Sequence, residues 1–161
     1  MEIRETALPE LPACVSLIRE SFGTVAKEFG FTPENAPRFT AFAMTEERLR
    51  RDLAGGHPMF TASENGQIVG FVSLTPEAGG SCEVSHLAVL PAYRHRGIGH
   101  ALLDRAEEEA RARGCVRMTL SLVDENRRFR TWYESFGYVH THAVKFDFFP
   151  FTCGYMEKPL P

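Results

Sequence analysis

The sequence lacks a hydrophobic run long enough to cross a membrane. Its longest segment without Asp, Glu, Lys or Arg is residues 65–76, well short of the roughly 20 apolar residues that a membrane-spanning helix needs. The first five residues, MEIRE, contain no apolar stretch of the kind found in a secretory signal peptide. These absences predict a cytoplasmic protein with no membrane partner.

Two further absences narrow the function classes. The sequence contains no C-x-x-C pair. Its four cysteines are widely separated: Cys14, Cys82, Cys115 and Cys153. In a cytoplasmic chain, cysteines spaced in this way are predicted to be reduced thiols in the core. There is also no excess of basic charge, because 18 Lys and Arg stand against 21 Asp and Glu for a formal net charge of −3. No overall field therefore draws the chain to nucleic acid, and any basic site must be local.

What is present is the composition of one globular domain. A chain of 161 residues with 43% hydrophobic and 24% charged residues fits a single domain spanning residues 1–161. Hydrophobic spacing predicts helices near residues 11–22, 46–54, 98–113 and 126–136 and strands near residues 3–4, 59–63, 67–74, 82–89, 116–123 and, in two pieces, 139–156. This order defines a mixed α/β domain built on one sheet.

A loop dense in arginine and glycine joins the predicted strand 82–89 to the predicted helix 98–113. The start of a helix offers unpaired N–H groups and partial positive charge, which suit phosphate oxygens. Gly97 and Gly99 allow an anion to approach the backbone, and Arg94 and Arg96 add full charges. The loop has neither the P-loop motif nor the third glycine of a dinucleotide fingerprint. It therefore predicts a phosphate site of another kind, with an ordinary surface loop as the alternative.

Two motifs resemble those of one known family. R-x-x-G-x-G, at Arg94–Gly99, resembles the pyrophosphate signature of the GNAT superfamily of acyl-CoA-dependent N-acyltransferases. The segment from Asn126 to Tyr138 resembles the family pattern N-x-x-A-x-x-x-Y-x-x-x-G-F, with Phe129 in place of Ala and Tyr138 in place of Phe. The separation of the motifs and the order of the elements also match along nearly the whole chain.

The resemblance implies a fold and a cosubstrate. The fold is α/β (α+β), a single GNAT-like domain with a mixed, mostly antiparallel sheet of six to seven strands, flanked by about four helices. The sheet is splayed between the fourth and fifth strands, residues 82–89 and 116–123, and the pantetheine arm of acetyl-CoA enters that gap. No metal is needed. The implied cofactor-binding residues are Leu87, Ala88, Val89, Arg94, His95, Arg96, Gly97, Ile98, Gly99, His100 and Asn126.

The resemblance also implies roles at the reacting centre. The N–H of Val89 would donate to the thioester oxygen, and Tyr133 would protonate the departing thiolate, with an ordinary buried aromatic as the alternative. Glu83 is the candidate base, with a solvated strand end as the alternative. By the two-residue period of a strand, Ser85 shares the face of Glu83 and His86 points to the other face. Some relatives carry a catalytic Glu on the next strand, where this chain has Ser121.

The predicted function is transfer of an acetyl group from acetyl-CoA to a primary amine of a small molecule or peptide. Direct attack in a ternary complex is favoured, because neither motif contains a cysteine. The acceptor pocket is expected between residues 22–42 and the aromatic run 146–155. One alternative is a catalytically silent acyl-CoA sensor. Another is a nucleic-acid binder, although the net charge disfavours it. That binder would use five arginines: Arg94, Arg96, Arg127, Arg128 and Arg130. An edge strand near the C-terminus suggests a homodimer.

Overall fold

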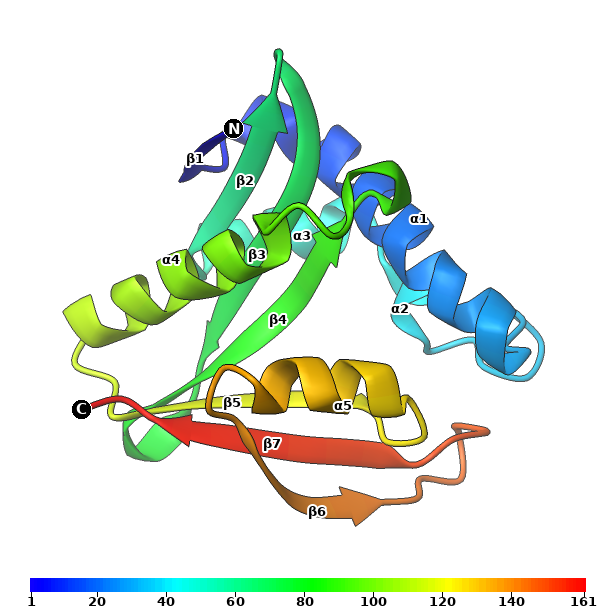
Figure 1. The fold of residues 1–161 in the computed structure, drawn as a ribbon. Helices are drawn as coiled ribbons and strands as arrows, with labels where there is room; N and C mark the ends of the chain where they lie inside the picture. The colour runs from blue at the N-terminus through cyan, green and yellow to red at the C-terminus, as the bar shows by residue number, and fades with distance from the viewer.

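One mixed sheet of seven strands, in the order β1-β2-β3-β4-β5-β7-β6, runs through the structure, a computed structural model that describes residues 1–161 (Figure 1). Every neighbouring pair is antiparallel except β4 and β5, which are parallel. The strands are β1 (Glu2–Glu5), β2 (Met59–Glu64), β3 (Gln67–Pro76), β4 (Ser81–Val89), β5 (Arg117–Val123), β6 (Val139–Val144) and β7 (Cys153–Pro159). The predicted mixed, mostly antiparallel sheet is confirmed.

Five α-helices flank the sheet, one more than predicted. They are α1 (Leu11–Phe29), α2 (Thr40–Ala43), α3 (Glu46–Ala54), α4 (Ile98–Ala112) and α5 (Arg127–Glu134). The additional helix, α2, is a single turn, which is too short for a hydrophobic period to reveal. Thr45 caps α3, because its side chain accepts a hydrogen bond from the N–H of Arg48. No helix has the length and apolar character needed to cross a membrane.

Helices α1 and α4 cover opposite faces of the sheet. Met59 packs in the hydrophobic cluster around α1, whereas its neighbour Phe60 packs in the cluster around α4. Because successive side chains of a strand point to opposite faces, the two clusters lie on different sides of β2. A third cluster, rich in phenylalanine, joins the end of α1 to α2 and to Phe151 near the start of β7.

The predicted splay between β4 and β5 is confirmed. These strands pair only over Ser81–Glu83 and Arg117–Thr119, and beyond that they diverge, as Figure 1 shows. The register between β3 and β4 shifts just past this point, and His86 has a φ of 55°. A bulge at His86 therefore turns β4 away from β5 and leaves a gap between them.

Two packing features tie the domain together. The carboxylate of buried Glu107 in α4 accepts hydrogen bonds of 2.9 Å from the Tyr138 hydroxyl and from Lys158 Nζ of β7. Cys82 and Cys115, whose Cα atoms are 6.4 Å apart, form a disulfide, while Cys14 and Cys153 are free and buried. The expectation of four reduced thiols was wrong for this pair, because a separation of 33 residues in the sequence gave no sign of proximity.

Candidate active site

A cavity of about 450 Å³ lies where the end of β4, the start of α4, α1 and α5 meet. Nine of the eleven predicted cofactor-binding residues line it, from Leu87 to Val89 and from Arg94 to His100 except Arg96. Helix α1 adds Ser21, Phe22 and Val25, which the motifs could not indicate. Helix α1 carries neither motif, and only the fold brings it to this cavity.

The loop before α4 points its amides into this cavity. His95 and Gly97 both have positive φ, at 64° and 80°, a backbone pattern that gathers successive N–H groups into an anion-binding hollow. The first helical hydrogen bond runs from Ala101 N to Gly97 O at 3.0 Å. The three preceding amides, from Ile98 to His100, have no helical partner and are available to an anion.

The charged side chains of this cavity are all basic. Arg94 donates through Nη2 to both the carbonyl oxygen and the hydroxyl oxygen of Ser21, each at 3.2 Å, which ties the loop to α1. Burial and the neighbouring charge of Arg128 lower the pKa of the Arg94 guanidinium. No Asp or Glu lines the cavity. An anion bound here would relieve the repulsion between Arg94 and Arg128.

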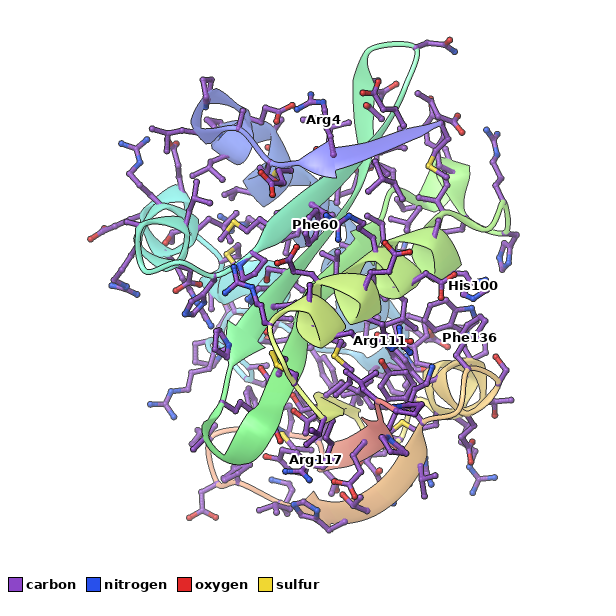
Figure 2. All side chains as sticks on the ribbon, turned by 90° about the vertical axis from the view of Figure 1, so that its left-hand side faces the viewer. Arg4, Phe60, His100, Arg111, Arg117 and Phe136 are labelled. Carbon is purple, nitrogen blue, oxygen red and sulfur yellow. A yellow bond between two sulfur atoms is a disulfide. The ribbon has the colours of Figure 1, made fainter.

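The start of α4 packs directly on α5. An added Cβ at Gly99 would lie 3.3 Å from the Trp132 ring, so a larger residue would require that ring to shift by a few tenths of an ångström. The His100 imidazole stacks on Phe136 with ring centroids 4.1 Å apart (Figure 2). The two sequence motifs therefore meet along one seam, and Trp132 and Phe136 join the cavity wall.

Two predicted cofactor residues lie outside this first cavity. Arg96 points away, with its guanidinium 5.0 Å from the centroid of the Tyr93 ring and 3.7 Å from a carboxylate oxygen of Glu64. Asn126 lines a second, smaller cavity instead. Its Oδ1 accepts a hydrogen bond from the N–H of Phe129 at 3.3 Å and so caps α5. Its Nδ2 is buried and has no partner.

The second cavity, of about 180 Å³, lies between β4 and β5 and adjoins the first. Five residues belong to the walls of both cavities: Phe22, Val25, Leu87, Phe129 and Tyr133. Residues predicted for the acceptor region also line it, including Phe39 and Phe149. The two spaces thus share a wall at the splay of the sheet.

Tyr133 stands at this shared wall with its hydroxyl unbonded to the protein. Its ring meets that of Trp132 edge to face, with centroids 5.0 Å apart. Burial raises the pKa of the Tyr133 phenol above its ordinary value, so the phenol stays protonated and can donate.

Glu83 ends a chain of hydroxyl groups beside the second cavity but lines neither cavity. Ser85 Oγ donates to Glu83 Oε1 at 3.2 Å, so the 2.8 Å contact between Thr75 Oγ1 and Ser85 Oγ has Thr75 as the donor. Burial raises the pKa of the Glu83 carboxyl, and the hydrogen bond from Ser85 offsets part of that rise. The predicted shared face of Glu83 and Ser85 is confirmed.

His86 lies in the wall of the second cavity. Strict alternation predicted that it would face away from Glu83, but the bulge interrupts that alternation. Arg48 is a charged neighbour of both Glu83 and His86. Burial, with a smaller effect of Arg48, lowers the pKa of the His86 imidazole to about 4. His86 is therefore neutral at pH 7.

The backbone of β4 offers one donor to the gap. Leu90 N donates to Val69 O on β3 at 2.9 Å. Because successive N–H groups of a strand point to opposite edges, the N–H of Val89 points away from β3 toward the splay. This is the direction that the predicted donation to a thioester oxygen requires.

No group of three or more His, Cys, Asp or Glu side chains gathers in a way that could hold a metal ion. His140 bonds through Nε2 to Asp124 Oδ1 at 2.7 Å, whereas His142 stacks on Tyr155. These two histidines therefore have separate packing roles.

A family model described as the acetyltransferase (GNAT) family matches residues 18–138, and the chain belongs to this family. Its fold is similar to that of PaiA N-acetyltransferase from Thermoplasma acidophilum in complex with coenzyme A (TM-score 0.83, 21% identity, 98% of each chain covered). It is also similar to ribosomal-protein-alanine N-acetyltransferase from Brucella melitensis (TM-score 0.77, 22% identity, 99% of this chain and 100% of that chain).

A third similar structure is the phosphinothricin acetyltransferase Pat from Sinorhizobium meliloti in complex with AcCoA (TM-score 0.75, 20% identity, 99% of this chain and 88% of that chain). At these identities the likeness defines the fold and leaves the acceptor open.

Proposed function

We propose that this chain is an N-acetyltransferase that moves the acetyl group of acetyl-CoA to a primary amine by direct attack in a ternary complex. The observation that carries this proposal is the shared wall of the two cavities at the splay of β4 and β5. A basic cavity with free amides suits the pyrophosphate of the coenzyme. The adjoining apolar cavity suits an acceptor that must meet the thioester at Tyr133 and Leu87. The coenzyme-bound PaiA and AcCoA-bound Pat structures, which share this fold, support the choice of cosubstrate.

The coenzyme would lie along the residues of the first cavity. The amides of residues 95–100 would take the pyrophosphate, and Arg94 would add charge. The pantetheine arm would pass between Leu87 and Tyr133 and pair with the free edge of β4, as an added strand does. This would place the thioester oxygen next to the N–H of Val89, where one such donor is worth about 3 kcal/mol as the oxyanion forms.

The chemistry then needs two proton movements. The amine nitrogen attacks the acetyl carbon and loses one proton. Water on the side of Ser85, whose hydroxyl is hydrogen-bonded to Glu83, would carry that proton to Glu83. The carbon–sulfur bond breaks, and Tyr133 protonates the departing thiolate. Burial raises the pKa of the Tyr133 phenol, so the phenol is protonated when the thiolate departs.

A covalent route through cysteine is disfavoured. Cys153 lines the second cavity, but burial, with the nearby charge of Glu125, raises the pKa of its thiol. The thiol rather than the thiolate is therefore present at neutral pH, and the thiol is the poor nucleophile.

The other function classes have less support. A silent acyl-CoA sensor would need no acceptor space, yet the second cavity adjoins the first. A nucleic-acid surface would need free arginines, but three of the five candidates form ion pairs within the chain: Arg96 with Glu64, Arg128 with Glu28 and Arg130 with Asp124.

The test is calorimetry with acetyl-CoA followed by a thiol-release assay with a panel of primary amines. We expect coenzyme binding and amine-dependent release of thiol. Binding without release for any amine would support the sensor, and absence of coenzyme binding would reject both functions.

A further inference from the structure

Most of the wall of the second cavity is apolar, and Arg38 is its one formally charged side chain. Thirteen of its 18 wall residues are hydrophobic. Arg38 is the only Lys or Arg among them, and the wall contains no Asp or Glu. His86, with the pKa of its imidazole lowered to about 4 by burial, is neutral at pH 7. An acceptor with several positive charges would find no carboxylate here and would be repelled by Arg38.

Arg38 belongs to the part of the second cavity's wall that the first cavity does not share. Tyr133 and Leu87 line both cavities, whereas Arg38 lines the second only. It belongs to the connection between α1 and α2, and its guanidinium carbon lies 4.1 Å from the ring centroid of Phe148 in the β6–β7 connection. Figure 1 shows both connections on the open side of the fork between β4 and β5. An acceptor that reaches Tyr133 with its amine would extend toward Arg38 with its other end.

The charge of Arg38 is not neutralised by the protein. The arginines at positions 96, 128 and 130 pair with carboxylates, but Arg38 forms no ion pair and rests on the exposed Phe148 ring. An aromatic face holds a guanidinium in place without cancelling its charge. The guanidinium therefore remains free to bind a carboxylate or another planar anion by two hydrogen bonds.

Size and shape restrict the acceptor further. About 180 Å³ is below the roughly 300–1,000 Å³ of sites for drug-sized ligands, so the acceptor is compact. Phenylalanine rings supply a large part of the wall: Phe22, Phe39, Phe129, Phe149 and Phe151. Such rings favour a flat, apolar body by edge-to-face or offset stacking.

We propose that the acceptor is a compact primary amine whose apolar, preferably aromatic, body carries an anionic group at the end opposite the amine. This inference rests on the proposed acetyltransferase function. The body packs among the phenylalanines, the anion binds Arg38, and the amine meets the thioester at Tyr133. The nitrogen gains a bond to the acetyl carbon as the carbon–sulfur bond breaks, with one proton lost by the amine and one gained by the thiol.

A matched series of three amines tests the charge preference on one molecular shape. The compounds are 4-(aminomethyl)benzoate, benzylamine and 1,4-bis(aminomethyl)benzene, which place a carboxylate, a hydrogen and an ammonium opposite the reacting amine. We expect kcat/KM with acetyl-CoA to be about tenfold higher for the carboxylate than for benzylamine, and lowest for the diamine.

The variant Arg38→Gln should reduce the preference for the carboxylate to within about twofold, chiefly through KM, and Arg38→Glu should reverse it. The control is Arg51→Gln, which removes an exposed arginine of α3 that lines neither cavity. It should leave the preference unchanged. An equal or greater kcat/KM for the diamine, or a preference that survives Arg38→Gln, would overturn the inference while leaving the acetyltransferase function intact.

Binding of the product provides a readout that needs no turnover. Calorimetry should show that 4-(acetamidomethyl)benzoate binds the wild-type protein about tenfold more tightly than Arg38→Gln. Failure of that ligand to bind, or equal binding by both proteins, would also overturn the inference. Failure of acetyl-CoA to bind is a separate result, because it would reject the proposed function itself.

Discussion

Glu83 and Thr119 are the last residues at which β4 and β5 pair, and the strands separate immediately beyond them. The fork therefore begins at Glu83, three residues before the bulge at His86. This places a half-buried carboxyl beside the gap between the two strands, although Glu83 lines neither cavity.

Glu83→Gln should change the pH dependence of the reaction. Burial raises the pKa of this carboxyl, and the base acts only when deprotonated, so wild-type kcat/KM should rise as pH increases through that pKa. The variant should lose most activity between the pKa of Glu83 and that of the amine, where a base is needed, and should recover at higher pH. Initial rates from pH 5 to 10 provide the measurement. Overlapping profiles would leave Glu83 with a structural role only.

The stability of the same variant gives a second readout. A carboxyl whose pKa is raised in the folded state destabilises the fold once pH exceeds that pKa. Thermal unfolding at pH 8 should therefore show Glu83→Gln to be as stable as the wild type or more so. Lower stability at pH 8 would mean that the lost activity comes from damage to the fold.

Tyr133→Phe should lower kcat by about 100-fold, because the departing thiolate loses its proton donor. The dissociation constant of acetyl-CoA should stay within about twofold, as the ring remains in the wall. Tyr93→Phe is the matched control, since that hydroxyl donates to Gln67 Oε1 at 3.1 Å although the ring lines the same cavity. Comparable turnover for Tyr133→Phe and the wild type would remove the acid role.

The substitution Asn126→Ser should distinguish two roles of the Asn126 side chain, which are the capping of α5 by Oδ1 and any contact made by the unpartnered Nδ2. Serine is as good a cap as asparagine, so the melting temperature should change little. The missing amide donor should lower kcat/KM by about three- to tenfold if it binds a carbonyl of the bound substrates. Asn126→Ala should lower both stability and activity. An unchanged kcat/KM for Asn126→Ser would restrict Asn126 to capping.

Cys153→Ala should retain turnover within about twofold, because the direct mechanism does not use this thiol. Mass spectrometry after incubation with acetyl-CoA should detect no acetylated enzyme. Cys14→Ala, in the cluster around α1 and in neither cavity wall, is the control. Complete loss of turnover in Cys153→Ala alone, with an acetyl adduct on the wild-type protein, would indicate a covalent route.

Lys158→Met should lower the free energy of unfolding by about 2 kcal/mol, because it leaves the buried Glu107 carboxylate with weaker compensation. Tyr138 still donates to that carboxylate, and Arg111 lies 3.8 Å away, which limits the loss. Urea unfolding measures the change. Arg50→Met removes an exposed pair with Glu46 and should cost no more than about 0.5 kcal/mol. Equal effects of the two variants would contradict the structural role assigned to Glu107.

The sequence by itself determined the local elements and the coenzyme half of the candidate site. The hydrophobic spacing that predicts these elements acts through neighbours along the chain, so the predicted helices and strands are present. Residues 94–100 likewise form a local loop, which is why the sequence could indicate most of the residues from this loop that line the first cavity.

Only the tertiary structure decided the acceptor half, the Cys82–Cys115 pair and the face of His86. The wall of the second cavity comes from α1, β4, β5, α5 and the β6–β7 connection, and contacts between such distant segments leave no period in the sequence. A bulge interrupts the strand alternation at His86. The place of Arg38 in the wall depends on how the α1–α2 connection packs against Phe148 of the β6–β7 connection.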